Sequence, residues 1–235
     1  MFGTHEIPLN LENEGFSICI KREADLFIYK RETGKETTEK VILGNQKHIL
    51  LNPIEPLNLP KNLSPYLNIK FLRPVKIEPK LSRKIFLTFP LEIGVFLYKK
   101  KSFKIIDIFT LAQPKFTLYG EPSSGIICKY WKSEIYSSIP SLDHFYEGIM
   151  ELSLTNTSEE WQEVSEAIFN ASGMKIFYND KKVAMKAEMK VENQSTAETD
   201  FFDSPLEKDM TRSLELFKAK KLPIATTKFL MREGI

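Results

Sequence analysis

The sequence has few of the residues and motifs from which an activity is usually inferred. Its 235 residues include two cysteines and three histidines. His5, His48 and His144 lie in different segments without a partner at metal-ligand spacing, and no HExxH, CxxC or His-x-His occurs. We therefore expect no metal site, no cofactor and no catalytic residue of these classes. Asp143, beside His144, favours a loop hydrogen bond over a catalytic dyad.

Glycine is also scarce, at 10 residues, and no phosphate-binding loop is present. The segment from Gly120 to Gly125 resembles the start of such a loop, but it lacks the lysine and the helix that bind phosphate. We interpret it as a tight turn in which Pro122 fixes the backbone. No Gly-x-Ser-x-Gly elbow occurs, which argues against an α/β hydrolase.

Neither sign of charge predominates. The 33 basic and 31 acidic side chains give a net charge of +2, whereas a non-specific nucleic-acid binder needs a concentrated basic surface. The densest basic run, Lys99 to Lys101, is typical of a solvated turn between two apolar strands. We therefore expect no nucleic-acid partner.

Long apolar runs are absent as well. No window approaches the roughly 20 uninterrupted apolar residues of a membrane-spanning helix. The first residues lack the basic and apolar regions of a signal peptide. Cys19 and Cys128 lie inside apolar segments and are expected to be reduced, buried thiols. The sequence predicts a cytoplasmic protein without direct membrane insertion.

Short apolar or alternating segments recur through the chain and are typical of β-strands. Phe16, Ile18 and Ile20, for example, alternate with polar or small residues. We predict a mainly β protein of two β-sandwich-like units, residues 1–113 and 114–235, with the boundary near Pro114. One large sandwich is the alternative, because all-β domains of this length exist.

The strongest helix signal lies near the C-terminus. Ser204 suits an N-cap and Pro205 the first helical position. An apolar stripe follows at helical spacing, formed by Leu206, Met210, Leu214 and Phe217. We predict an amphipathic helix near 205–221.

A second segment, near 158–169, carries weaker helical signals. Trp161, Val164 and Ile168 have helical spacing. Thr157 and Glu160 have the spacing of a capping box. A short helix is predicted there, with a strand as the alternative.

The candidate binding surface combines aromatic and charged side chains in the region 119–136: Tyr119, Lys129, Tyr130, Trp131, Lys132, Glu134 and Tyr136. In a strand over 126–132, Ile127, Lys129 and Trp131 share one face. Such a face suits a sugar that stacks on the ring, or a partner protein held by an aromatic anchor. The alternative is that Trp131 belongs to the core and the lysines extend to solvent.

Carboxylates available for acid–base chemistry include Glu78, Glu92, Glu121 and Glu134. Glu92 stands between Leu91 and Ile93 in an apolar strand. The alternation of strand residues favours a solvent-facing Glu92 over a buried, paired one.

Four segments in the middle of the chain carry a family resemblance: 52–60 (NPIEPLNLP), 87–96 (LTFPLEIGVF), 114–120 (PKFTLYG) and 129–134 (KYWKSE). In them the chain resembles the archaeal family known as domain of unknown function 432. The resemblance implies an archaeal cytoplasmic protein. It implies no established activity and no functional residues.

Together these observations predict a non-enzymatic binding or accessory module. Its partner is expected to be a protein, in one version a membrane-associated one, that contacts the region 119–136. Binding of a small ligand or carbohydrate by an aromatic platform is the alternative. A second alternative is an enzyme that uses Glu78, Glu92 or Glu134 as acid or base.

Overall fold

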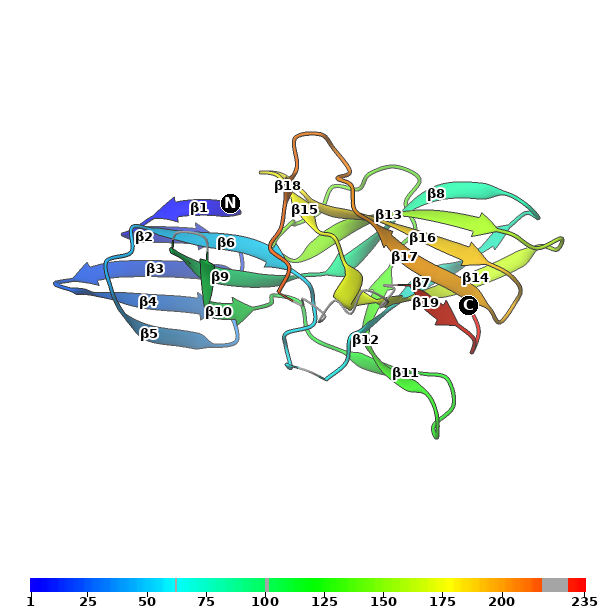
Figure 1. Cartoon of the computed structure of the whole chain (residues 1–235), viewed down its shortest axis with the longest axis horizontal. Coiled ribbons are helices and arrows are strands. Elements are labelled where there is room, and N and C mark those ends of the chain that lie inside the picture. The colour runs from blue at the N-terminus through cyan, green and yellow to red at the C-terminus, as the bar shows by residue number, and fades with distance from the viewer. Residues whose placement is uncertain (62, 100–101, 217–227) are drawn as a thin grey trace. The chain divides into compact units, whose positions relative to one another are not determined.

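Nearly all regular structure in the chain is β-strand (Figure 1). The computed structural model describes residues 1–61, 63–99, 102–216 and 228–235. Strands account for 58% of the chain and helix for 1%, which confirms the prediction of a mainly β protein. Within the described residues, no helix is long and apolar enough to cross a membrane. Lys100 and Lys101 of the predicted basic turn lie outside the described residues.

The chain forms two compact units, and each unit takes two separate segments. Unit 1 comprises Met1–Asn52 and Ile93–Leu111, and unit 2 comprises Pro53–Glu92 and Ala112–Ile235. Residues 53–92, which the sequence analysis assigned to the N-terminal domain, therefore belong to unit 2. Strand pairing explains this assignment, because strands from 53–92 pair with strands from the second half of the chain.

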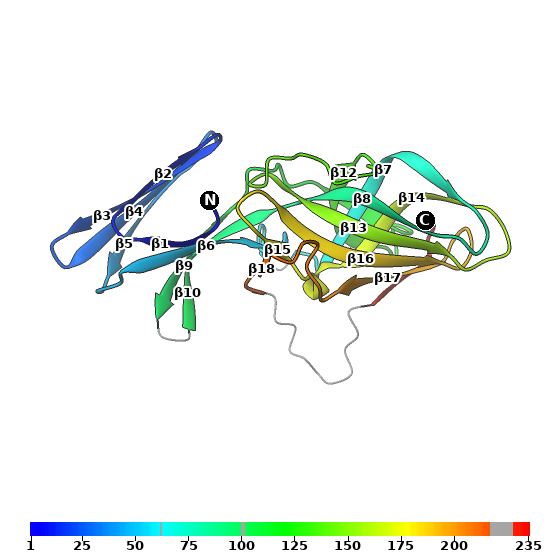
Figure 2. The same cartoon turned by 90° about the horizontal axis from the view of Figure 1, so that it is seen from above.

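Unit 1 consists of two four-stranded sheets that pack face to face (Figure 2). One sheet is a meander of β2 (Leu9–Asn13), β3 (Phe16–Glu23), β4 (Leu26–Thr33) and β5 (Thr37–Leu43). The other has the order β1 (Gly3–Glu6), β6 (His48–Ile54), β9 (Glu92–Lys99) and β10 (Ser102–Phe109). Phe16, Ile18 and Ile20 are buried between the sheets, as their alternation predicts. The Phe16 ring lies 5.2 Å from that of Phe109 in the opposite sheet.

Unit 2 also contains two sheets. The first has the order β11 (Phe116–Tyr119), β12 (Ile126–Ser133), β7 (Tyr66–Ile77) and β14 (Gln162–Asn170). The second has the order β18 (Thr211–Arg212), β15 (Phe177–Tyr178), β16 (Val183–Val191), β13 (Glu147–Asn156) and β8 (Ser82–Pro90). Strand β17 (Ala197–Phe202) pairs with β16 and with β19 (Phe229–Met231). The 3₁₀ turn η1 (Ala171–Gly173) follows β14.

The predicted short helix near 158–169 is wrong, since most of this segment is strand β14. Ala167, Ile168 and Phe169 are all buried, because both faces of the strand are covered there. Apolar residues on both faces obscure the period-two pattern from which a strand is recognised. The proposed cap residue Thr157 donates its hydroxyl to the Val191 carbonyl at 2.9 Å, so it caps no helix.

The predicted C-terminal helix near 205–221 is also wrong over the residues that the structure describes, 205–216. Residues 205–216 form turns, bends and β18, and 217–221 lie outside the described residues. Strand β18 pairs with β15, and the Ser213 amide donates to the Ile176 carbonyl at 2.9 Å. Met210 is buried against Ile149, Phe177 and Ala184. Packing on the sheet therefore replaces the local helical preference.

Gly148 of β13 has a steric role. It pairs with Phe89 of β8, and a Cβ added to Gly148 would lie 2.4 Å from that ring. Gly148→Ala is expected to lower the free energy of unfolding by about 1–3 kcal/mol through overpacking. Urea unfolding measures this change. Gly34→Ala is the control, because its Cβ would meet nothing within 4 Å. Equal effects of the two replacements would contradict the steric role.

Candidate functional site

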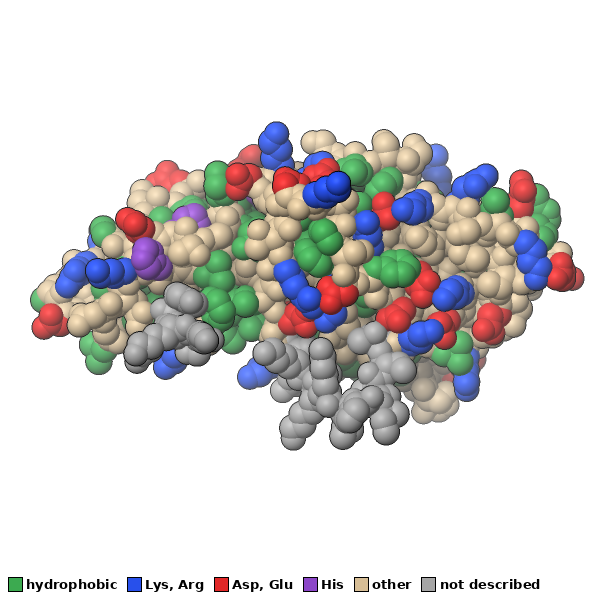
Figure 3. Space-filling view, turned by 45° about the horizontal axis from the view of Figure 1, so that its top comes forward, with side chains coloured by type: hydrophobic (Ala, Val, Ile, Leu, Met, Phe, Trp, Pro, Cys, Tyr) green, Lys and Arg blue, Asp and Glu red, His purple; other side chains and the backbone are tan. Residues whose placement is uncertain are grey.

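The surface carries charges of both signs. Figure 3 shows lysine, arginine and acidic side chains interspersed over the face that it presents. Charged side chains of the protein also pair with each other, as in the contact of 3.0 Å between Lys84 Nζ and Glu151 Oε1. The described residues of this face therefore form no concentrated basic area of the kind that nucleic-acid backbones require.

Tyr119, the first of the seven predicted site residues, is a buried anchor for the C-terminal segment. Its hydroxyl donates to the Gly234 carbonyl at 2.9 Å and accepts from the Glu233 amide at 3.0 Å. Burial raises the pKa of this hydroxyl, so it stays protonated. Its ring also faces Phe229 of β19. Tyr119 thus has a structural role in this arrangement.

Lys129 is also buried, in an ion pair with Glu92. Its Nζ lies 2.8 Å from Glu92 Oε1 and donates to the carbonyls of Pro56 and Leu59 at 2.8 and 3.1 Å. Glu92 is 0% exposed, so its predicted solvent-facing position is wrong. The proline-rich segment 53–60 covers both side chains, which sequence alternation alone does not reveal. All three protons of the ammonium group thus have acceptors within the protein.

Trp131 is partly buried and contacts β8. Its Nε1 donates to the Thr88 hydroxyl at 2.9 Å, and its ring lies 5.9 Å from that of Tyr146. The Thr88 hydroxyl also contacts the carboxyl group of Glu147. Trp131 is therefore only half-buried, and its polar atom is already paired.

Tyr136 and Glu134 lie near β8, the strand that Trp131 contacts. The backbone of Tyr136 forms two hydrogen bonds of 2.9 Å with Phe86 of β8. Burial, with the nearby charges of Glu134 and Glu147, raises the pKa of the Tyr136 hydroxyl. Glu134 is exposed. The structure thus brings Trp131, Glu134 and Tyr136 together, whereas Tyr119 and Lys129 are buried in contacts with other segments.

Tyr130 and Lys132 occupy the opposite face of β12 from Trp131. Tyr130 is partly exposed and Lys132 is exposed. They pair in register with Asn68 and Lys70 of β7. The seven residues consequently do not form one binding surface.

An apolar surface that the sequence analysis missed lies on the hairpin of β11 and β12. Phe116 is 39% exposed, Leu118 44% and Ile127 48%. Leu118 pairs with Ile127, and Phe116 pairs with Lys129, so these side chains share one face. The alternation of Phe116 and Leu118 around Thr117 was visible in the sequence, but their exposure was not. We call Phe116, Leu118 and Ile127 the hairpin surface.

The hairpin surface adjoins a sheet edge that no described strand covers. Strand β11 is the last strand of its sheet among the described residues. The Tyr130 amide donates to the Lys115 carbonyl at 2.8 Å. Lys115 and every second residue after it therefore direct their backbone groups toward β12. Because antiparallel pairs alternate, the backbone groups of Phe116 and Leu118 point away from β12. They are available to an added strand.

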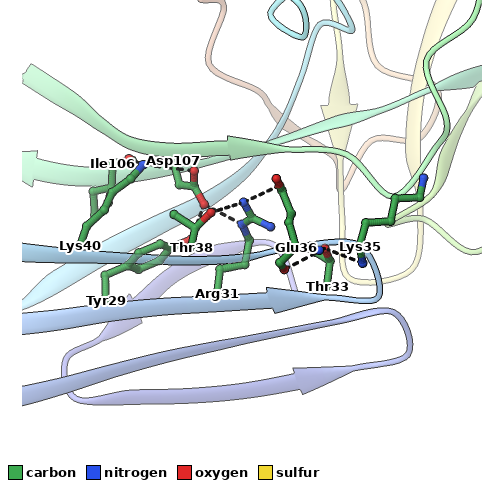
Figure 4. Close-up of polar contacts among 9 residues, drawn as sticks. All are labelled: Tyr29, Arg31, Thr33, Lys35, Glu36, Thr38, Lys40, Ile106 and Asp107. Carbon is green, nitrogen blue, oxygen red and sulfur yellow. Dashed lines mark hydrogen bonds and ion pairs between the residues drawn. The ribbon is translucent and has the colours of Figure 1, made fainter.

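Unit 1 has a buried polar network of its own (Figure 4). Asp107 of β10 accepts from Tyr29 Oη at 2.9 Å and from Arg31 Nε at 2.7 Å. Arg31 Nη2 donates to Glu36 and Thr38, each at 2.8 Å. The Arg31 guanidinium also lies 4.8 Å from the centroid of the Phe109 ring. This network links strands of the two sheets, which is a structural role.

Metal and acid–base sites have little support in the geometry. Among the described residues, no group of three or more His, Cys, Asp or Glu side chains is placed to hold a metal ion. Asp143 Oδ1 accepts from the Phe145 amide at 3.0 Å, a loop hydrogen bond as predicted. Glu78 and Glu134 are exposed while Glu92 is buried, so these carboxyl groups do not share one environment.

Comparison with known proteins places nearly the whole chain in one family. A family model described as protein of unknown function (DUF432) matches residues 1–232. No curated protein and no solved structure matches the chain.

Proposed function

Because the chain belongs to the DUF432 family, whose function is unknown, we propose its role from its surface. We propose a non-enzymatic binding module that takes up an extended segment of a partner protein at the edge of β11. The observation that supports this proposal is the hairpin surface of Phe116, Leu118 and Ile127 beside a sheet edge that no described strand covers. An added strand would gain main-chain hydrogen bonds from the edge and side-chain burial from the apolar residues.

Buried and half-buried side chains of β12 hold the strand beneath this surface in place. Strand β12 is fixed by the contacts of Lys129 with Glu92 and of Trp131 with Thr88. A preorganised surface loses less conformational entropy on binding. The predicted residues Lys129 and Trp131 thus serve the proposed function as supports for the neighbouring contact residues.

The proposal places the protein in the cytoplasm. Cys19 and Cys128 are free thiols, and burial raises the pKa of Cys128 to about 12. A protonated thiol is a poor nucleophile, so Cys128 resists oxidation. The proposal includes membrane-associated partners, because strand addition needs only an extended segment in reach of β11.

Peptides selected from a displayed random library on the immobilised protein provide the test. Leu118→Lys and Ile127→Lys are expected to weaken binding of a selected peptide about tenfold or more, since each removes apolar contact at the centre of the surface. Isothermal titration calorimetry measures the affinity. The control is Lys132→Gln on the opposite face of β12.

Hydrogen exchange tests the binding mode separately. Amide exchange at Phe116 and Leu118 should slow when the peptide binds, whereas Thr117, whose amide faces β12, should change little. Unchanged exchange at Phe116 and Leu118, or full affinity of both lysine variants, would refute strand addition at β11.

A further inference from the structure

A cavity of about 280 Å³ lies in unit 2, apart from the hairpin surface. Its apolar lining comes from the loop before β13, from β13 and from β16: Ile139, Pro140, Leu142, Ile149 and Val183. Its polar lining is Ser141, His144, Glu147, Lys181 and Lys182. The volume is near the lower end of small-ligand sites, about 300 Å³.

Two groups of opposite charge line this cavity without an ion-pair partner among the residues that the structure describes. The carboxyl group of Glu147 is hydrogen-bonded by the Thr88 hydroxyl, and no ion pair involves it among the described residues. Lys181 is exposed, and its ammonium group likewise forms no ion pair in the described part of the chain. Lys182 differs, because its Nζ lies 2.6 Å from Glu207 Oε1. The cavity therefore presents one unpaired anion and one unpaired cation beside apolar side chains.

We propose that this cavity binds a small zwitterion with an apolar body, of the size of a free aliphatic amino acid. The ligand's ammonium group would contact Glu147, its carboxylate would contact Lys181, and its side chain would lie against Leu142, Ile149 and Val183. Charge-assisted hydrogen bonds of this kind are stronger than neutral ones. This inference does not depend on the hairpin surface.

The environment of Glu147 gives the site a pH dependence. Burial raises the pKa of Glu147, the Thr88 hydrogen bond lowers it, and the charge of Asp143 raises it again. His144, Lys181 and Lys182 are the other titratable groups that line the cavity. The ammonium group of the ligand binds the ionised carboxylate, so affinity should rise as pH increases through the raised pKa. Binding below that pH should release a proton.

Calorimetric titration with leucine is the test, with 4-methylpentanoate and 3-methylbutylamine as probes that each lack one charge. Leucine should bind the wild-type protein at least about tenfold more tightly than either probe. Glu147→Gln and Lys181→Gln should each weaken leucine binding by a similar factor. Glu121→Gln and Lys132→Gln, exposed residues outside the cavity lining, are the matched controls.

Three outcomes would overturn the proposal. They are no binding of leucine, valine or methionine, equal binding of leucine and the singly charged probes, and full affinity in Glu147→Gln. Circular dichroism of each variant shows whether it is folded. The conservative variant Glu147→Asp keeps the charge and should retain pH-dependent binding, which separates lost recognition from lost structure.

Discussion

Replacing Glu92 by leucine is expected to lower the free energy of unfolding by about 3–5 kcal/mol, the cost of leaving a buried charge without its partner. Lys129 is 5% exposed and would keep only the carbonyl groups of Pro56 and Leu59 as acceptors. The amides of Asn58 and Leu59, which donate to Glu92 at 2.8 and 3.1 Å, would lose their acceptor. Removal of one carboxyl group thus leaves three donors, the Lys129 ammonium group and the two amides, without this acceptor. Both tryptophans lie in unit 2, so their fluorescence during urea unfolding measures the change.

The control for this prediction is an ion pair in the same unit whose lysine is exposed. Lys84 Nζ lies 3.0 Å from Glu151 Oε1, and the lysine side chain is 64% exposed. Lys84→Met should cost no more than about 1 kcal/mol. The double replacement Glu92→Leu with Lys129→Met should recover part of the loss, because it removes the uncompensated charge. If Glu92→Leu lowers the free energy of unfolding by less than Lys84→Met does, the burial of the Glu92–Lys129 pair is contradicted.

Replacing Asp107 by leucine is expected to destabilise unit 1 by a similar amount, about 3–5 kcal/mol. Arg31 is 2% exposed and would lose its buried carboxylate partner while remaining charged, and would keep only the exposed carboxylate of Glu36. The hydroxyl of Tyr29 would lose its acceptor as well; burial, and then the charge of Asp107, raise the pKa of that hydroxyl. Hydrogen exchange in β3 and β4 measures the stability of unit 1 directly.

Lys40 provides the matched control in unit 1. Its Nζ lies 3.2 Å from Asp107 Oδ1, but its side chain is 42% exposed. Lys40→Met should cost only about 0–1 kcal/mol, since solvent screens this contact. If Lys40→Met and Asp107→Leu accelerate exchange equally, the ranking of these contacts by burial is wrong.

Much of the strand content could be predicted from the sequence, because half-buried strands alternate. The buried set Phe16, Ile18 and Ile20 illustrates this. The prediction failed where pairing between distant segments decides the structure. Residues 211–212 are a strand because β15 lies beside them, and nothing local to their sequence specifies that partner. Intrinsic propensity is a weak guide in such cases.

The site was less predictable for a related reason. Exposure of a strand residue depends on which loop covers it. Lys129 and Ile127 share a face of β12, yet Lys129 is 5% exposed and Ile127 48% exposed. The segment 53–60 covers one and not the other, and its position follows from contacts with Glu92 far away in the sequence. Clustering of aromatic and charged residues in the sequence therefore could not show which side chains of β12 reach solvent.

The two-segment construction of each unit determines the order in which they become complete during synthesis. Unit 1 lacks β9 and β10 until residue 109 has been made, and by then β7 and β8 of unit 2 are already present. Their partners β12, β13 and β14 are synthesised only afterwards. During synthesis, β7 and β8 therefore exist for a time without their partner strands, with apolar side chains and unpaired backbone groups. Unpaired strands of this kind are prone to pair with other chains. For the same reason, no single cut in the chain yields both units intact, and an isolated unit 2 requires residues 53–92 joined to residues 112–235.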